Sequence, residues 1–180
     1  VKPIFEKIDL KEKDHVVDFF KRYRDIDGII HFAACKAVGE SVNDPLKYYE
    51  NNISSLVHIL GGLQRFKEPK FIFSSSCTVY GQADELPITE NAPVKEVKSP
   101  YGNTKKIGEQ IIKDLCNCND SFSAITLRYF NPIGGHSSAK IGELPIGIPQ
   151  NLVPFVTQTA IGIRKKLSIF GKDYPTPDGT

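Results

Sequence analysis

Short apolar segments alternate with amphipathic ones along the chain, and this alternation predicts most of the secondary structure. The apolar segments have the length of strands and lie at 4–10, 28–34, 70–75 and 123–130. Between them, hydrophobic positions recur with the period of a helix, which predicts helices over 13–23, 45–66 and 101–115. Pro45, preceded by Asn43 and Asp44, suits the first turn of the second helix. We also expect a helix that opens at Asn151 and a short edge strand around 168–170.

This order of elements indicates the α/β class. Parallel strands need crossover connections, and these connections are right-handed. We therefore predict a Rossmann-like, doubly wound parallel sheet with helices on both faces. No internal repeat or low-complexity segment interrupts it.

Composition excludes several classes of protein. Of 180 residues, 40% are hydrophobic and 24% are charged, which is ordinary for a soluble globular domain. The net charge of +2 comes from interspersed charges, so we expect no nucleic-acid partner. No apolar run near 20 residues and no signal peptide is visible, so we expect no membrane partner and take the cytoplasm as the default location. The cysteines lack the paired spacing of a zinc site, and we expect free thiols and no metal.

Tyr101 and Lys105 are the first candidates for chemistry. They lie four residues apart in a predicted helix, so both side chains project from one face. A phenol has a pKa of about 10, and an ammonium beside it favours the phenolate. Alone, a YxxxK pattern is usually two surface residues. The serines of 74–76 strengthen the signal because they follow a predicted strand, and ligands of parallel sheets bind at the carboxyl ends of strands. There Ser76 could hydrogen-bond the Tyr101 phenol.

The chain resembles the short-chain dehydrogenase/reductase superfamily, in its extended branch that acts on nucleotide sugars. More narrowly it is similar to the UDP-glucose 4-epimerase family. The resemblance covers essentially the whole chain and rests on motifs in a specific order: HFAACKAVGESV, YYENNI, SSSCTVYG, SPYGNTK, RYFNPIGGH, GIPQNLVPF and SIFGKDYPTPDGT. It implies that 1–130 is a partial NAD-binding Rossmann domain and 131–180 a partial substrate-binding region.

The resemblance also implies residue roles. The implied catalytic residues are Tyr101, Lys105 and Ser76. The implied NAD contacts are Asp9, Leu10, Phe32, Ala33, Ala34, Lys36, Asn51, Ser74, Tyr101, Lys105 and Tyr129. The implied contacts to the UDP-sugar are Lys36, Ser76, Tyr101, Phe130, Asn131, Asn151, Leu152, Ser168 and Phe170.

The implied reaction interconverts UDP-glucose and UDP-galactose. Tyr101 as phenolate takes the proton of the sugar 4-hydroxyl while hydride leaves C4 for NAD+. The transient 4-keto sugar then turns over, and hydride returns to its other face. The family expectation is a homodimer.

Two features leave alternatives open. The chain has no glycine-rich GxxGxxG turn, begins at Val1 and ends within a loop, so we expect a fragment that lacks the first βαβ unit and is itself inactive. Among related enzymes, a 4,6-dehydratase places Asp-Glu just after its serine or threonine, whereas Cys77 and Thr78 follow Ser76 here. A decarboxylase or reductase of the superfamily is less excluded. A non-catalytic nucleotide-sensing module would be expected to lose Tyr101 or Lys105.

Overall fold

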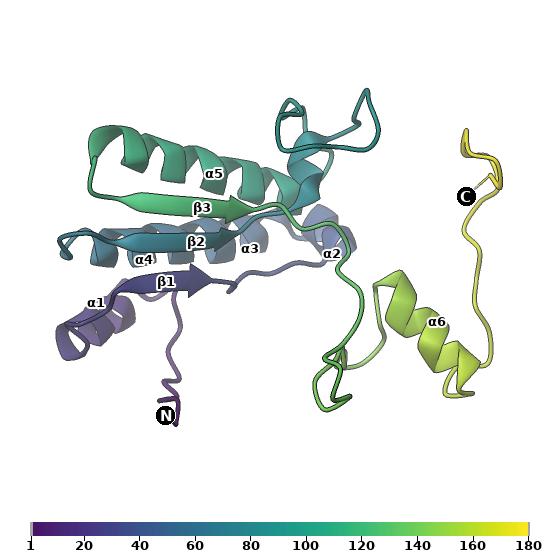
Figure 1. The fold of residues 1–180 in the computed structure, drawn as a ribbon, viewed down its shortest axis with the longest axis horizontal. Helices are drawn as coiled ribbons and strands as arrows, with labels where there is room; N and C mark the ends of the chain where they lie inside the picture. Colours follow the sequence, from purple (N-terminus) through teal and green to yellow (C-terminus); the bar gives the residue numbers. More distant parts are fainter. Residues whose placement is uncertain (1, 180) are drawn as a thin grey trace. The chain divides into compact units, whose positions relative to one another are not determined.

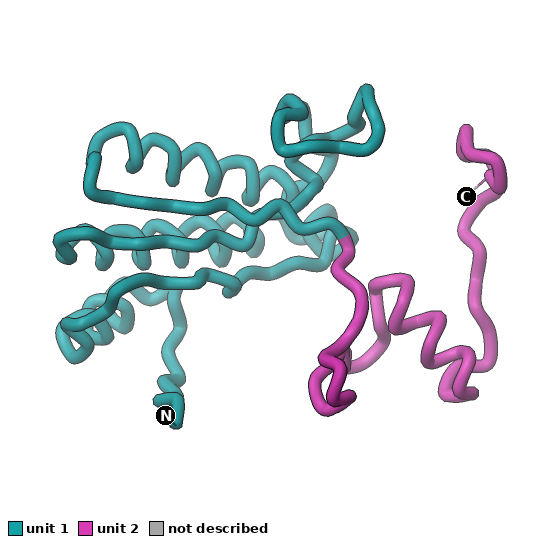
Figure 2. The backbone as a smooth tube through the Cα atoms, viewed as in Figure 1, with its two compact units in different colours: residues 1–130 teal, residues 131–180 magenta. Residues whose placement is uncertain are grey.

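The computed structural model of the chain describes residues 2–179. It divides into two compact units, residues 1–130 and 131–180, which are coloured separately in Figure 2. Each unit is described by itself below.

The first unit is built on a parallel sheet (Figure 1). Its strands are β1 (Gly28–His31), β2 (Lys70–Ser74) and β3 (Ser123–Leu127), in the order β1-β2-β3. Both neighbouring pairs are parallel, with Ile30 beside Ile72 and Ile72 beside Ile125. The predicted α/β, Rossmann-like sheet is therefore confirmed, and all carboxyl ends of the strands point to one edge.

Helices cover one face of this sheet. The side chains of α1 (Lys13–Arg22), α4 (Ser55–Leu63) and α5 (Pro100–Cys118) pack on Phe71 and Phe73 of β2. The helical residues of this core are Val16, Phe20, Leu56, Ile59, Leu60, Leu63 and Ile112. Phe71 and Phe73 share one face because successive strand residues point to opposite sides.

The opposite face corrects the prediction of helices on both sides. The isoleucines at 30, 72 and 125 form a row across it, and Ile30 and Ile125 are 60% and 58% exposed. Among residues 2–130, therefore, no helix shields the ends of this row. The alternation of strands and helices along the chain is what suggested two helical layers.

Two predicted strands are wrong. Segments 4–10 and 168–170 have no strand conformation, and Phe5 and Phe170 are 87% and 92% exposed. A strand is stabilised by its ladder with a neighbour. In the part of the chain that the structure describes, β1, β2 and β3 pair only with each other.

The predicted helix over 45–66 begins as expected but is not continuous. The Asp44 side chain accepts a hydrogen bond from the Lys47 amide at 3.3 Å, and Pro45 opens α3 (Pro45–Tyr49). A π-helical turn, Glu50–Ser54, then separates α3 from α4. The short helix α2 (Val38–Asn43), which precedes them, was not predicted.

The later helices fall close to their predicted places. Ser99 caps α5 by accepting a hydrogen bond from the Gly102 amide at 3.1 Å, with Pro100 in the first turn. In the second unit, Asn151 precedes α6 (Leu152–Ala160). A 3-10 helix, Cys77–Tyr80, follows β2. None of the helices within residues 2–179 combines the length and the apolar character that crossing a membrane requires.

Two adjacent glycines of α4 allow a matched test of the α1–α4 packing. A Cβ on Gly62 would lie 2.1 Å from Cε2 of the buried Phe20 ring, whereas a Cβ on Gly61 would meet nothing within 4 Å. We expect Gly61→Ala to raise the free energy of unfolding by about 0.5–1 kcal/mol, because Ala is the better helix former. We expect Gly62→Ala to lower it by about 1–3 kcal/mol through overpacking. Denaturant unfolding of the full-length protein measures both, and equal effects would contradict the packing described.

Candidate active site

The parallel sheet brings three chain segments together where its strands end. β1 continues into Phe32, β2 into Ser75 and Ser76, and β3 into Tyr129. The Phe32 and Tyr129 rings stack with centroids 6.5 Å apart. The Cys77 amide donates a hydrogen bond of 2.8 Å to the Tyr129 carbonyl, which joins the exits of β2 and β3. Helix α5 places Tyr101 and Lys105 beside these segments.

Lys105 is a buried cation at this edge. Its side chain is 4% exposed, and its Nζ donates a 2.7 Å hydrogen bond to the Ser74 carbonyl at the end of β2. Nζ also lies 5.0 Å from the centre of the Phe73 ring and 5.8 Å from that of Tyr101. Burial disfavours the charged form and lowers the pKa of Lys105 to about 8.

His31 is a second buried basic group, but it carries no charge at neutral pH. It is 5% exposed at the end of β1 and stacks on Phe71 and Phe73. Burial first, and then repulsion from Lys105, lower the pKa of His31 to about 4. A neutral imidazole avoids placing two positive charges in the same apolar surroundings.

The Tyr101 phenol differs from its prediction. We expected the Lys105 ammonium to lower the pKa of Tyr101, but burial raises it above its usual value. The ammonium is directed at the Ser74 carbonyl, with Nζ 5.8 Å from the centre of the phenol ring, and in the chain alone it does not offset the burial. In the chain alone, therefore, Tyr101 is a protonated phenol at pH 7.

Ser76 opposes this effect of burial. The nearby Ser76 hydroxyl acts to lower the pKa of the phenol. The Ser76 oxygen accepts hydrogen bonds from the Thr78 amide at 3.2 Å and from the Thr78 hydroxyl at 3.0 Å. With its acceptor positions used, the 7% exposed Ser76 is left to donate its own proton. A donated hydrogen bond stabilises phenolate, as a base at this position needs.

Glu109 and Arg128 anchor the site, and sequence reasoning missed both. Arg128 donates to the Glu109 carboxylate through Nε at 2.9 Å and Nη2 at 2.8 Å, and the Ser75 hydroxyl donates to the same carboxylate. The Glu109 hydrogen bonds raise the pKa of Arg128. Because such bidentate pairs are strong and directional, this one fixes α5 against the exits of β2 and β3. The available signal was spacing, since Glu109 follows Lys105 by one further turn.

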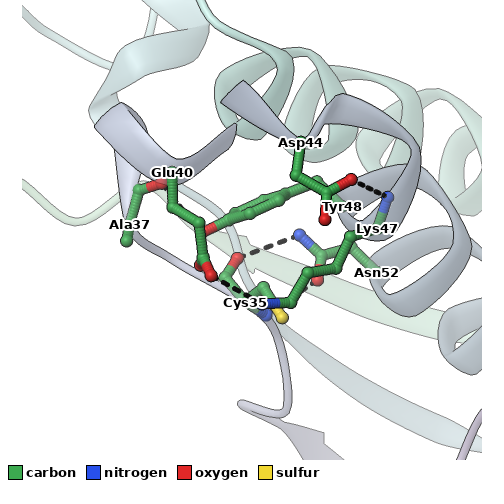
Figure 3. Close-up of polar contacts among 7 residues, drawn as sticks. All are labelled: Cys35, Ala37, Glu40, Asp44, Lys47, Tyr48 and Asn52. Carbon is green, nitrogen blue, oxygen red and sulfur yellow. Dashed lines mark hydrogen bonds and ion pairs between the residues drawn. The ribbon is translucent and has the colours of Figure 1, made fainter. Parts of the chain in front are cut away.

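A third missed residue is Asn52 in the π-helical turn. Its side-chain amide accepts from the Cys35 amide at 2.8 Å and donates to the Cys35 carbonyl at 3.0 Å (Figure 3). The predicted neighbour, Asn51, contacts Asn52 instead, through Nδ2 at 2.9 Å from Oδ1. Nearby, the fully buried Tyr48 hydroxyl lies 2.8 Å from the Ala37 carbonyl and 2.7 Å from Glu40.

The other predicted NAD contacts are scattered more widely. Ala33, Ala34 and the exposed Lys36 continue the segment after Phe32. Asp9 and Leu10 lie on the turn before α1, not at the end of a strand as predicted. The Asp9 carboxylate accepts from the Lys11 amide at 2.9 Å, and the Leu10 carbonyl is 3.0 Å from Nδ1 of His58 in α4. The structure thus gathers Phe32, Ser74, Ser76, Tyr101, Lys105 and Tyr129.

The predicted UDP-sugar contacts lie mostly in the second unit. Phe130 ends the first unit and stacks on Tyr80, with centroids 6.5 Å apart. Asn151 donates to Glu143 at 3.1 Å, and Leu152 begins α6. Asn131, Ser168 and Phe170 are exposed. The roles of these residues stay predictions.

No metal centre is formed by the described residues. Residues 2–179 contain no group of three His, Cys, Asp or Glu side chains placed to hold an ion. The four cysteines are free thiols.

Several known proteins similar to this chain are named UDP-glucose 4-epimerase. The UDP-glucose 4-epimerase of Drosophila melanogaster is 46% identical over 176 residues, which cover 98% of this chain and 50% of that protein. The enzyme of the same name from Dictyostelium discoideum is 49% identical, again over 98% of this chain and 51% of the relative. The chain therefore spans about half the length of the curated relatives it matches.

Solved structures agree in fold. A UDP-glucose 4-epimerase from Bifidobacterium longum, in complex with NAD+ and UDP, superposes with a TM-score of 0.91 at 44% identity. The match covers 99% of this chain and 53% of that one. A UDP-glucose-4-epimerase from Stenotrophomonas maltophila, with bound NAD and formylated UDP-arabinopyranose, gives 0.88 at 43% identity, over 99% and 52% of the two chains.

The family comparison covers almost the whole sequence. Residues 2–180 match a family model described as GDP-mannose 4,6 dehydratase. This description and the names of the relatives refer to different reactions, so membership alone does not choose between them. Because the family model matches residues 2–180 and the solved structure from Bifidobacterium longum shares the fold at 44% identity, the chain belongs to the extended short-chain dehydrogenase/reductases, in the NAD-dependent epimerase/dehydratase family.

Proposed function

We propose that the full-length protein interconverts UDP-glucose and UDP-galactose by inverting C4, with NAD as its cofactor. The observation that carries this proposal is the arrangement of Ser76, Tyr101 and Lys105 around the end of β2. The proposal is supported by relatives named UDP-glucose 4-epimerase that are 46% to 49% identical over 98% of the chain.

The residues at the sheet edge suit a nicotinamide nucleotide. Lys105 has three N–H donors, and among the described residues its ammonium makes one hydrogen bond, to the Ser74 carbonyl. The remaining donors suit the hydroxyl groups of a ribose. Phe32 is 62% exposed and Tyr129 is 37% exposed, so their stacked rings offer an apolar surface for a flat ring. NAD, when bound, supplies the acceptor and then the donor of the hydride.

The chain's own residues move the proton. Tyr101 is the acceptor for the proton of the sugar 4-hydroxyl and returns the same proton when the opposite C4 configuration forms. Ser76 donates to the phenol oxygen and so favours the phenolate. Because burial raises the pKa of Tyr101, the phenolate also needs positive charge nearby, which Lys105 provides from the next turn of α5.

The dehydratase reaction is the second candidate, because the family model carries its name. Expelling water from a sugar requires an acid and a base besides the tyrosine. The residues after Ser76 do not supply them: burial raises the pKa of the Cys77 thiol, and Thr78 uses its hydroxyl to donate to Ser76. The local chemistry therefore supports epimerisation.

We extend the proposal to location and assembly. The family resemblance supports a homodimer, and the free thiols of all four cysteines are in keeping with the reducing cytoplasm.

Tyr101→Phe tests the proposed base. Removing one hydroxyl removes the proton acceptor, and we expect kcat for UDP-galactose conversion by the full-length protein to fall by about 10²–10⁴. Tyr23→Phe is the control, because its hydroxyl bonds Glu6 at the surface. Unchanged turnover in Tyr101→Phe would reject the base. Release of a 4-keto-6-deoxy sugar by the wild type would identify a dehydratase instead.

Lys105→Met tests the burial of the cation. Since the pKa of Lys105 is about 8 when folded and about 10.5 when unfolded, the folded state binds fewer protons between these pH values. The contribution of Lys105 to the free energy of unfolding is therefore lowest below pH 8 and rises as the pH approaches 10.5.

We expect Lys105→Met to stabilise the full-length protein at pH 7, by up to roughly 3 kcal/mol at about 1.4 kcal/mol per pKa unit, while turnover is lost. The gain should shrink as the pH rises to 10. Denaturant unfolding at pH 7 and 10 measures it. The opposite result would be a variant that is less stable than wild type at pH 7, with a smaller deficit at pH 10. It would show that the ammonium stabilises the fold.

A further inference from the structure

We propose that Asn52 is a positioning residue that holds segment 32–37 in register with helix α5. This segment carries Phe32, Ala33, Ala34 and Lys36, and α5 carries Tyr101 and Lys105. The inference deepens the proposed function, on which it relies for the role of segment 32–37 in binding the nicotinamide nucleotide.

Asn52 links the two elements through one side chain. Its amide pairs with the Cys35 backbone in both directions, as a neighbouring strand would, by bonds of 2.8 and 3.0 Å. Its Nδ2 also donates to the Thr104 hydroxyl at 3.0 Å. Thr104 in turn donates to the Tyr101 carbonyl at 2.7 Å. A continuous series of hydrogen bonds therefore runs from Cys35 to the backbone of the proposed base.

The direction of each hydrogen bond is fixed. The Cys35 amide can only donate, so it must face Oδ1 of Asn52, and the Cys35 carbonyl must face Nδ2. Thr104 uses its hydroxyl proton on Tyr101, so it accepts from Asn52. With Asn51 as the second donor to Oδ1, Asn52 uses both amide protons and both acceptor positions. No other side chain of this size offers two N–H donors together with an oxygen that accepts two hydrogen bonds.

The backbone around Asn52 is adapted to this contact. Asn52 is 6% exposed and lies in the middle of the π-helical turn Glu50–Ser54. Such turns are rare and occur frequently at functional sites. Polar side chains within a helix usually turn toward solvent, whereas this one is turned inward against Cys35 and Thr104.

Segment 32–37 depends on such a contact because it leaves the sheet. β1 ends at His31, and the next six residues have no ladder with β2. The far end of the segment is held by Tyr48, whose hydroxyl meets the Ala37 carbonyl and Glu40 (Figure 3). Asn52 holds its middle. Between these two contacts the backbone has one position relative to Tyr101 and Lys105.

Asn52→Asp is the sharpest variant, because it keeps the shape and replaces the donor by an oxygen. At pH 8 that carboxylate oxygen faces the Cys35 carbonyl and the Thr104 oxygen and repels them. At pH 5.5 a protonated carboxyl can donate again, and burial beside a carbonyl favours that form. The titratable groups drawn beside it in Figure 3 are Cys35, Glu40, Asp44, Lys47 and Tyr48, and helix α5, which Asn52 contacts through Thr104, carries Tyr101 and Lys105. Ratios to wild type at each pH remove their contribution.

The matched control is Ser55→Ala. Ser55 is 3% exposed, follows Asn52 by one turn, and hydrogen-bonds only within its own helix, to the Asn51 and Asn52 carbonyls. Within the described residues, its hydroxyl makes no hydrogen bond to segment 32–37. A purely structural loss in this helix should therefore affect Ser55→Ala and Asn52→Asp alike.

Two measurements on the full-length protein test the proposal. The first is NADH affinity by fluorescence, for which we expect Asn52→Asp to be at least tenfold weaker than wild type at pH 8 and to recover most of the loss at pH 5.5. Ser55→Ala should bind NADH within twofold of wild type at both pH values. The second is hydrogen exchange without nucleotide, for which we expect faster exchange of 32–37 in Asn52→Asp and unchanged exchange of β2.

Wild-type NADH affinity in Asn52→Asp at pH 8, or equal losses in the variant and in Ser55→Ala, would overturn the proposal. If Asn52→Asp does not fold, Thr104→Val replaces it. That variant removes the acceptor of Asn52 at nearly constant volume, and unchanged exchange of 32–37 together with unchanged NADH affinity would equally overturn the link. A wild type that binds no NADH refutes the proposed cofactor, whereas the exchange measurement still tests the Asn52 contact.

Discussion

The buried ammonium of Lys105 is the interaction on which the candidate site depends. Removing a charge from water is costly unless hydrogen bonds replace the lost hydration. Here the Ser74 carbonyl provides one such bond, and the Phe73 ring faces the cation from 5.0 Å. The low pKa of about 8 shows that this compensation is partial. A chain selected only for stability would place an apolar side chain there, so the position is better explained by chemistry than by packing.

Close packing of α5 on the sheet makes this contact possible. Gly108 lies one turn beyond Lys105, and a Cβ there would be 2.8 Å from the Phe73 ring and 3.1 Å from Leu56. Its absence lets the helix axis approach β2, which brings Nζ within reach of the strand end. On the same face, Glu109 bonds Arg128 and Ser75. One helix face therefore carries Tyr101, then Lys105 one turn later, and then Gly108 and Glu109 in the turn after that.

Sequence reasoning predicted the parts of this arrangement that depend on local pattern. The alternation of strands and helices predicted the parallel sheet, and the four-residue spacing placed Tyr101 and Lys105 together. It missed what depends on distant partners. The apolar residues of 4–10 form a strand only with a neighbour, and the second face of the sheet has a helical layer only if other residues provide one. The choice between Asn51 and Asn52 depends on a π-helical turn that no spacing rule anticipates. The pKa of Tyr101 was misjudged because burial of the phenol raises it, while the Lys105 ammonium is directed at the Ser74 carbonyl.

The distribution of charge around Tyr101 follows from these contacts. Arg128 is neutralised by the Glu109 carboxylate, whose two oxygens it engages, and its guanidinium stacks 4.8 Å above the Tyr80 ring. His31 is uncharged because burial lowers its pKa to about 4. Among the described residues at the carboxyl edge of the sheet, this leaves Lys105 as a positive charge without a carboxylate partner. A single uncompensated cation in apolar surroundings exerts a stronger field on a neighbouring phenol than the same cation in an ion pair, because neither a counter-charge nor water weakens it. The neutral imidazole and the closed Arg128–Glu109 pair therefore contribute to the site by leaving the field of Lys105 intact.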